Sequence, residues 1–373
     1  MTGVDRVEHA YLTHLLALET PLFGLVRTAA GYLLLDRAGA RGVAALATRG
    51  PVGPSDLLSR LTNRDPVRAR AEASVRRLAV GRALRGSLAR LLRHLPDGAS
   101  YLNTGHANLP DRGLAALHRR MRIAVLVHDC IPLDHPELSR PDTLAGFAAK
   151  LAAVSAHADL VIHTTQDARS RTEAHLRRMG RCPAGVVAGL GVPQPRPSAL
   201  PKGVDGSHGY FVTIGTIEPR KNHALLLDVW DTLAKSGQPP PPLYVVGARG
   251  WADPALFDRL ATTPGVTVLQ GLPDGAVAAL VQHAAALLFP SRAEGYGMPP
   301  VEAAALGTPV IASDLAVIRE VMGDYPVYLD PTDSYSWLET IKGWGPGADH
   351  ANVGTVRQPP RWQDHFNIVL SLV

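Results

Sequence analysis

Two glutamates, Glu294 and Glu302, lie eight positions apart in the segment SRAEGYGMPPVEAAALGTPVIAS, residues 291–313. The apolar run before the segment predicts a strand that ends at Ser291, and the paired prolines predict the first turn of a helix. A carboxylate accepts two hydrogen bonds from a vicinal diol, so Glu302 could hold the hydroxyls of a ribose and Glu294 those of a sugar. Taken singly, either acid could instead be an exposed loop residue or a favourable charge at a helix start.

The residues between the two acids are suited to binding an anion. Gly295 and Gly297 allow the backbone to come close to a ligand. The amide groups of a first helical turn lack intrahelical partners, and they form the positive end of the helix dipole, which attracts anions. We therefore expect the amides of Tyr296, Gly297 and Met298 to face a cleft and to bind a diphosphate there.

A second segment, FVTIGTIEPRKNHALLL at residues 211–227, places two cations after a predicted strand. The strand ends at Gly215, which we include in the expected binding site, and Arg220 and Lys221 come just before a helix. Two cations in a cleft could neutralise a pyrophosphate leaving group as its charge develops. A basic pair in solvent beside a helix is the alternative, and the position at a strand end favours the ligand site.

The chain alternates short apolar runs with helical patterns, which predicts an α/β fold of parallel sheets covered by helices. The pattern stops at residues 193–208, which contain four prolines and two glycines and are typical of a linker. We expect a first domain, a linker, a second domain and an irregular tail with a closing helix, at residues 1–192, 193–208, 209–343 and 344–373. Ligands of such doubly wound sheets bind beyond the carboxyl ends of the strands, here in a cleft between the domains.

The amino terminus departs from this alternation. Residues 4–18, VDRVEHAYLTHLLAL, predict a helix entered by a turn at Gly3, and no strand comes before it. Either another segment supplies that edge of the sheet, or the reading frame starts upstream of Met1, which is the explanation we favour.

The composition is that of an ordinary globular protein, with 46% apolar and 19% charged residues. No run is long enough to cross a bilayer, and the start of the chain does not resemble a secretory signal. Cys130 and Cys182 have no zinc-site spacing, which predicts reduced thiols in a cytoplasmic protein. No Asp-x-Asp sequence occurs, so we expect no essential metal and no cofactor.

Residues 60–93 hold ten arginines and only two acids, with apolar residues at helical spacings between them. The interpretation that we favour is a solvated helical face. The alternative is a basic amphipathic helix in peripheral contact with an anionic membrane. Nucleic acid is a third possibility, but no nucleic-acid motif accompanies the charge, so we expect no such partner.

The two glutamates within EGYGMPPVEAAALGTPVIAS, with GTIEPRKN about eighty residues upstream, resemble the retaining GT-B glycosyltransferases of family GT4. VHDCIPLDHPE and YLNTGHANL are similar to the subgroup of bacterial mannosyltransferases and other O-antigen-type transferases. The resemblance implies two Rossmann-like domains facing a cleft, with the carboxyl-terminal helix returning to the first domain. It also implies that the second domain holds a nucleotide sugar and that the first holds a glycan or lipid-linked acceptor.

The resemblance also implies roles for single residues. Lys221, joined by Arg220, would contact the diphosphate, Glu294 the donor sugar and Glu302 the ribose. Gly3 would lie in a first loop close to the diphosphate.

Transfer is expected to retain the anomeric configuration, with the acceptor attacking from the face that the diphosphate leaves. His128 would point at the transferred sugar, whereas a structural role is favoured for His106. Thr216 stands where many members of the family carry an arginine, and Arg220 would compensate for it.

Two other functions stay open. A nucleotide-sugar epimerase of GT-B architecture would need acid and base residues around the sugar. A degenerate transferase would act as a binding or scaffold subunit. For a true transferase, the expected location is the cytoplasm, with peripheral contact at the inner face of the membrane if residues 60–93 bind lipid.

Overall fold

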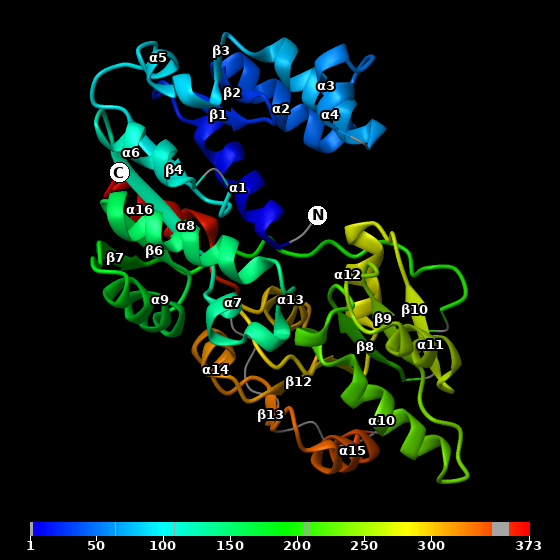
Figure 1. Cartoon of the computed structure of the whole chain (residues 1–373). Coiled ribbons are helices and arrows are strands. Elements are labelled where there is room, and N and C mark those ends of the chain that lie inside the picture. The colour runs from blue at the N-terminus through cyan, green and yellow to red at the C-terminus, as the bar shows by residue number, and fades with distance from the viewer. Residues whose placement is uncertain (1–2, 64, 108, 205, 207–208, 345–357) are drawn as a thin grey trace.

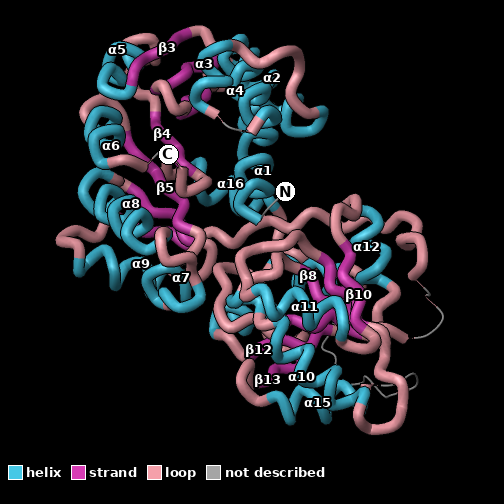
Figure 2. The backbone as a smooth tube through the Cα atoms, turned by 45° about the vertical axis from the view of Figure 1, so that its right-hand side comes forward, coloured by secondary structure: helices cyan, strands magenta, loops and turns pink. Residues whose placement is uncertain are grey.

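The computed structural model describes residues 3–63, 65–107, 109–204, 206, 209–344 and 358–373. These residues form two parallel sheets and one small antiparallel sheet (Figure 1). Figure 2 shows the strands in magenta and the helices that surround them. The irregular tail expected after residue 344 lies mostly outside the described residues.

The first parallel sheet has the order β4-β5-β6-β7. Its strands and the helices beside them are β4 (Ser100–Asn103), α6 (Asp111–His118), β5 (Arg122–Val127), α7 (Ile131–Asp134), α8 (Thr143–His157), β6 (Leu160–His163), α9 (Gln166–Arg178) and β7 (Ala184–Val187). Strand β6 is buried along its whole length, as continuous apolar strands of a sheet covered on both faces are. Among the described residues, no segment pairs with the outer edge of β4.

A three-stranded antiparallel sheet, order β1-β2-β3, precedes the first parallel sheet in the chain, and its third strand was not expected from the helical spacing. Its elements are β1 (Gly24–Arg27), β2 (Gly31–Leu35), α2 (Arg37–Arg49), α3 (Leu57–Thr62), α4 (Pro66–Leu78), β3 (Gly81–Leu84) and α5 (Leu88–Leu92). The helical spacing predicted across residues 60–93 is therefore wrong at β3. That strand forms because its backbone pairs with β2, and its residues alternate in burial as a half-covered strand does.

Helix α1 (Gly3–Ala17) packs against the last helix, α16 (Trp362–Leu370). The Tyr11 hydroxyl donates to His365 Nε2 over 2.5 Å, and the rings of His14 and Phe366 stack with centroids 3.9 Å apart. His365 Nδ1 donates to the Ala188 carbonyl at 3.1 Å, which fixes the ring between α1 and the strand end of β7. The expected return of the carboxyl-terminal helix to the first domain is confirmed.

The second parallel sheet has the order β10-β9-β8-β11-β12-β13. Its elements are β8 (Phe211–Ile214), α10 (His223–Ala234), β9 (Leu243–Val246), α11 (Pro254–Thr262), β10 (Val266–Leu269), α12 (Asp274–Gln282), β11 (Ala286–Phe289), α13 (Met298–Ala305), β12 (Val310–Ser313), α14 (Ala316–Met322), β13 (Val327–Leu329) and α15 (Ser334–Gly343). Counted along this domain, the order is 3-2-1-4-5-6, the dinucleotide-binding arrangement of a doubly wound sheet. The direction of winding reverses between β8 and β11, so the crevice for a ligand lies beyond the ends of these two strands.

The connection between β7 and β8 contains the predicted linker. Its described residues from 193 to 204 form neither helix nor strand. The domain boundaries that we drew around it remain predictions.

Candidate functional site

The two sequence segments singled out for chemistry meet where the winding of the second sheet reverses. Gly215 directly follows β8, and a short 3-10 helix, Pro219–Lys221, carries the two cations. Glu294 follows the neighbouring strand β11, with which β8 pairs in parallel. The adjacency of two strands thus brings together side chains more than seventy residues apart in sequence.

Glu294 is buried between both cations, with 7% of its side chain exposed. Its two carboxylate oxygens each accept one hydrogen bond, from Arg220 Nη1 at 2.7 Å and from Lys221 Nζ at 2.6 Å. Burial acts to raise the pKa of Glu294, but the charges of Arg220 and Lys221 outweigh it and lower the pKa to about 2. Glu294 is therefore ionised at neutral pH and is a very weak base.

The cations are held from other sides as well. Arg220 donates from Nη2 to Glu218 at 2.8 Å, and Lys221 Nζ lies 4.8 Å from the centroid of the Phe289 ring. A Cβ on Gly215 would lie 2.9 Å from Lys221 Cε, so the missing side chain leaves room for the lysine stem. Burial lowers the pKa of Lys221, against the attraction of Glu294. Together these contacts fix both cations in place.

The amino terminus of α13 lies beside the same ring. Gly297 has φ 90°, which favours glycine, and a Cβ there would lie 3.9 Å from Phe289 Cε1. The Phe289 ring therefore contacts both Lys221 and the start of α13. Within the described part of the chain, the amides of Tyr296, Gly297 and Met298 donate to no backbone acceptor outside a helix. The Tyr296 hydroxyl donates to the Leu190 carbonyl at 2.9 Å.

Glu302 belongs to α13, and Gly3, the first residue of α1, lies next to the start of that helix. Glu302 is half-buried and forms an ion pair with Arg6 of α1. A Cβ on Gly3 would lie 2.8 Å from Met298 Cε. The structure thus places Gly3 next to the start of α13, and it gives Glu302 a partner that sequence reasoning did not anticipate.

His128 follows strand β5 of the first domain and is buried. Its Nε2 donates to the Thr104 carbonyl at 2.7 Å, and its backbone amide donates to His106 Nε2 at 2.9 Å. Burial lowers the pKa of both rings, that of His106 to about 3. Because its Nε2 accepts a hydrogen bond, His106 is neutral and supports the loop that carries His128, in agreement with a structural role.

The loops that carry His128 and Glu294 touch each other at Gly295. A Cβ on Gly295 would lie 2.8 Å from Asp129 Oδ2 and 3.0 Å from the His128 carbonyl oxygen. The Thr164 hydroxyl donates to the Gly295 carbonyl at 3.1 Å. A residue with a side chain would push the loops apart, so glycine is required for the two halves of the site to meet.

Asp129 lies in the candidate site and was not predicted from the sequence. It lines, with Glu294, a cavity whose other polar walls include Asp134, Asp167, Arg171 and Arg292. Burial raises the pKa of Asp129, and the nearby charge of Arg220 opposes this effect. The signal was present in the sequence, since Asp129 is the third letter of the VHD motif that pointed to His128. The cavity lies between the ends of β5 and β11.

Among the residues that the structure describes, no group of three or more His, Cys, Asp or Glu side chains is arranged to hold a metal ion. No helix of the described residues has the length and apolar character needed to cross a membrane.

Residues 201–344 match the family model described as "Glycosyl transferases group 1". The serotype-specific mannosyltransferase WbdA of Escherichia coli is 27% identical over 240 residues, which are 59% of this chain and 29% of WbdA. The O-antigen chain mannosyltransferase B of Escherichia coli is 37% identical over 128 residues, 34% of each chain. The O-antigen chain mannosyltransferase RfbU of Salmonella typhimurium is 33% identical over 138 residues, 36% of this chain and 37% of RfbU. The chain thus spans about a third of the length of these relatives.

Solved structures resemble the chain over a larger share of its length. HepE of Anabaena, in complex with UDP-glucose, is 18% identical with a TM-score of 0.57 and covers 87% of this chain and 83% of HepE. TarM is 13% identical with a TM-score of 0.56 and covers 80% of this chain and 60% of TarM. At such identities the match speaks for the fold alone. With the two parallel-sheet domains, it confirms the GT-B fold.

Proposed function

We propose that this chain, whose residues 201–344 match the model of the glycosyl transferases group 1 family, transfers a sugar from a nucleotide-diphosphate sugar to a glycan acceptor. The observation that carries the proposal is the buried group of Arg220, Lys221 and Glu294 at the reversal of the sheet, next to the amides at the start of α13. A diphosphate is the ligand that such a set of fixed positive charges and amide dipoles suits best.

On the donor side, each predicted residue takes one part of the nucleotide sugar. Arg220 and Lys221 stabilise the diphosphate, together with the amides of Tyr296, Gly297 and Met298. Gly215 leaves room for the stem of Lys221, Gly3 lies beside the start of α13, and both glycines border the phosphates. Glu302 binds the ribose, which requires it to release Arg6.

The reaction that we infer proceeds with retention. The acceptor hydroxyl attacks the anomeric carbon from the face of the leaving diphosphate, the bond from that carbon to the phosphate oxygen breaks, and its electron pair stays on the diphosphate. A phosphate oxygen takes the hydroxyl proton. Glu294 is a poor base with a pKa of about 2, which supports an orienting role on the sugar for Glu294 and for His128.

On the acceptor side, the cavity beside Asp129 is suited to the hydroxyls of a glycan. The names of these relatives favour mannose as the transferred sugar and an O-antigen-type glycan as the acceptor. We further propose a lipid-linked acceptor, which the resemblance of the sequence implies, and a peripheral position at the inner face of the membrane. Both cysteines are free thiols, as a reducing cytoplasm requires.

A thermal-shift screen of nucleotide diphosphates and their sugars tests the donor site first. Ligand at a hundred times its Kd stabilises the folded chain by about 2.7 kcal/mol, so one base is expected to raise the melting temperature above the others. The second step mixes the matching nucleotide sugar with glycan acceptors. Release of nucleotide diphosphate only when acceptor is present supports transfer. Interconversion of the donor alone would mean an epimerase, and binding without any turnover would mean a scaffold.

A further inference from the structure

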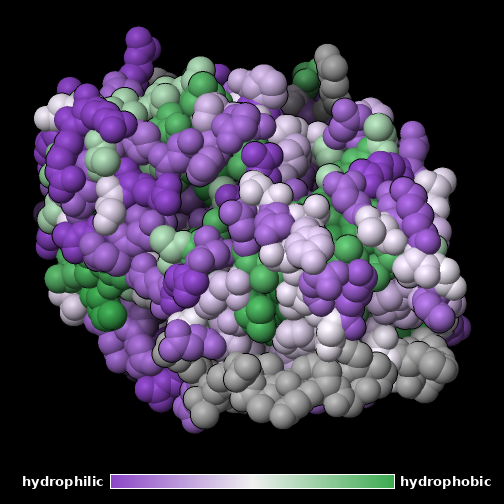
Figure 3. Space-filling view, turned by 90° about the horizontal axis from the view of Figure 1, so that it is seen from below, coloured by the Kyte–Doolittle hydropathy of each residue, from purple (hydrophilic) through white to green (hydrophobic). Residues whose placement is uncertain are grey.

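Exposed apolar side chains are concentrated in one short stretch of the chain. Eleven large apolar side chains are exposed among the described residues, and seven of them belong to residues 52–84: Val52, Leu57, Leu58, Leu61, Val67, Val80 and Leu84. On the face of the molecule seen in Figure 3, by contrast, hydrophobic residues form small separate groups among hydrophilic ones. A contiguous group of exposed apolar side chains marks an interaction surface, so the arrangement of these residues on α3 and α4 decides what they can bind.

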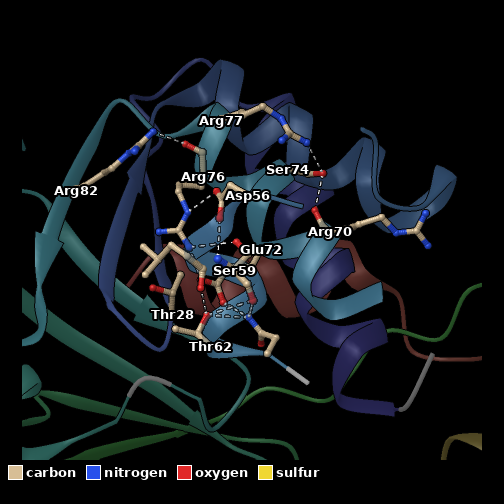
Figure 4. Close-up of polar contacts among 12 residues, drawn as sticks. Thr28, Asp56, Ser59, Thr62, Arg70, Glu72, Ser74, Arg76, Arg77 and Arg82 are labelled. Carbon is tan, nitrogen blue, oxygen red and sulfur yellow. Dashed lines mark hydrogen bonds and ion pairs between the residues drawn. The ribbon is translucent and has the colours of Figure 1, made fainter. Parts of the chain in front are cut away.

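Helix α3 is turned the opposite way from an ordinary surface helix. Its polar Ser59 is fully buried, whereas Leu57 and Leu61, one turn apart, are 75% and 76% exposed. The reason lies in the polar contacts beneath the helix (Figure 4). Arg76 of α4 donates from Nε to Asp56 at 3.0 Å and from Nη2 to Ser59 at 3.4 Å, and these bonds hold the polar side inward.

The same contacts leave the outer surface with a positive charge. Arg76 pairs with both Asp56 and Glu72, so two of the three acids between residues 52 and 84 have their charge balanced within the chain. The exposed arginines Arg60, Arg68 and Arg70 form no ion pair with any described residue. Asp65 is the remaining acid, and its carboxylate accepts from the Val67 amide at the start of α4.

We propose that the outer face of α3 and α4 docks on an anionic lipid surface. We call this face the α3–α4 face: the apolar side chains of Val52, Leu57, Leu61 and Val67 with the arginines Arg60, Arg68 and Arg70. Leucines enter the boundary between headgroups and acyl chains, and the arginines meet the lipid phosphates. A second copy of the chain fits this face poorly, since it would set unpaired arginines against one another.

The place of this face in the molecule agrees with such docking. Figures 1 and 2 both show α3 and α4 at the end of the first domain, opposite α15 of the second domain. A chain attached by this end presents its acceptor-binding domain to the membrane. The inference takes its purpose from the proposed lipid-linked acceptor, but its test does not depend on the donor site.

The test is flotation of the full chain with vesicles of phosphatidylglycerol and phosphatidylcholine, and with phosphatidylcholine alone. We expect binding to the anionic vesicles only, and weaker binding at high salt because exposed charges are screened. The double variant Leu57→Ser with Leu61→Ser, and the triple variant Arg60→Gln, Arg68→Gln and Arg70→Gln, are each expected to reduce binding at least tenfold.

Two controls match these variants on other surfaces. Tyr335→Ser removes an exposed apolar side chain of α15, and Arg112→Gln with Arg119→Gln and Arg140→Gln removes three exposed charges outside the face. Neither should change flotation. All variants alter exposed side chains, so circular dichroism and the nucleotide-induced thermal shift should be unchanged. If a variant of the α3–α4 face keeps the nucleotide-induced thermal shift but no longer floats, the loss is specific to membrane binding. If the unaltered chain floats but shows no thermal shift with any nucleotide, only the proposed donor site is overturned.

The proposal is overturned if the full chain does not float with anionic vesicles at low salt, or if the controls and the α3–α4 variants behave alike. It is also overturned if sedimentation shows a dimer that the leucine variant dissociates, because the face would then be an interface between copies. Binding to the neutral vesicles at equal strength would remove the role of the arginines.

Discussion

Replacing Glu294 by glutamine keeps the shape of the side chain and removes the charge shared by Arg220 and Lys221. Burial works to raise the pKa of Glu294, but the two cations lower it from 4.5 to about 2. This difference corresponds to roughly 3 kcal/mol of preference for the ionised form in the folded protein. The carboxylate is almost fully buried, so solvent screens little of this interaction.

We therefore expect Glu294→Gln to lower the free energy of unfolding by about 3 kcal/mol at neutral pH. For a domain of this size the loss equals roughly 6–12 °C in melting temperature, which scanning calorimetry measures. The contribution of an acid with a lowered pKa is complete above its unfolded pKa and disappears as the pH falls toward about 2. The difference between the two proteins should accordingly shrink below pH 4.5.

Nucleotide diphosphate should restore part of the loss, because its phosphates replace the missing negative charge beside both cations. Glu173→Gln is the matched control, since Glu173 of α9 also accepts from two cations, Arg169 and Arg177, each at 2.6 Å. The cations of that group reach the solvent, with 35% of Arg169 and 63% of Arg177 exposed, so removal of the Glu173 charge should cost about 1 kcal/mol or less, whether or not nucleotide is present. Equal losses in the two variants would refute the reasoning about burial. A smaller nucleotide-induced shift in Glu294→Gln than in the unaltered chain would refute the assignment of the cations to the diphosphate.

Three further predictions concern other residues of the first domain. Burial raises the pKa of Asp129, so its charge lowers the stability of the folded chain. The variant Asp129→Asn should therefore melt at the same or a higher temperature. Its kcat should fall at least tenfold, while the Kd for the donor stays unchanged. Calorimetry and initial rates measure these effects, and a lower melting temperature with full turnover would contradict them. Arg6→Ala frees Glu302 from a half-exposed ion pair worth about 1 kcal/mol or less, so titration calorimetry should show nucleotide diphosphate binding up to about fivefold tighter; weaker binding would mean that Arg6 itself contacts the ligand. Both ring nitrogens of His163 are buried without a partner among the described residues, and burial lowers the pKa of this ring to about 4. The ring of the unfolded chain takes up a proton below about pH 6.5, so the free energy of unfolding of the unaltered chain should fall by about 2 kcal/mol between pH 7.5 and 5. His163→Leu should not show this loss. Equal pH dependence of the two proteins in denaturation curves would exclude this cause.

The second domain could be predicted from the sequence because its signals are local. Each strand is a short apolar run, and each helix begins at recognisable residues such as the paired prolines after Met298. The contact of Lys221 and Arg220 with Glu294 could not be derived in the same way. It depends on β8 and β11 being neighbours in the sheet, which is a property of the topology and not of either segment.

In the arginine-rich residues 60–93, by contrast, the local pattern predicted only part of the structure correctly. The spacing in residues 60–93 fits α4, yet β3 forms in the same stretch because β2 offers it a pairing edge. The charge pattern also hid the inward direction of Arg76, which buries its guanidinium with Asp56 and Glu72. Counting arginines therefore predicts the sign of the surface, but only the packing decides which side of α3 meets the solvent.

The groups expected to hold the donor already have charged partners in the chain alone. Glu294 occupies both Arg220 and Lys221, and Arg6 occupies Glu302. Donor binding is then an exchange of partners, in which a diphosphate takes over the cations and a ribose takes over the acid. Its affinity is the difference between two sets of polar contacts and not the sum of the new ones. A ligand with only one of the two parts, such as a nucleoside or free pyrophosphate, breaks one pair and leaves the other in place, so both parts are needed to open the whole site.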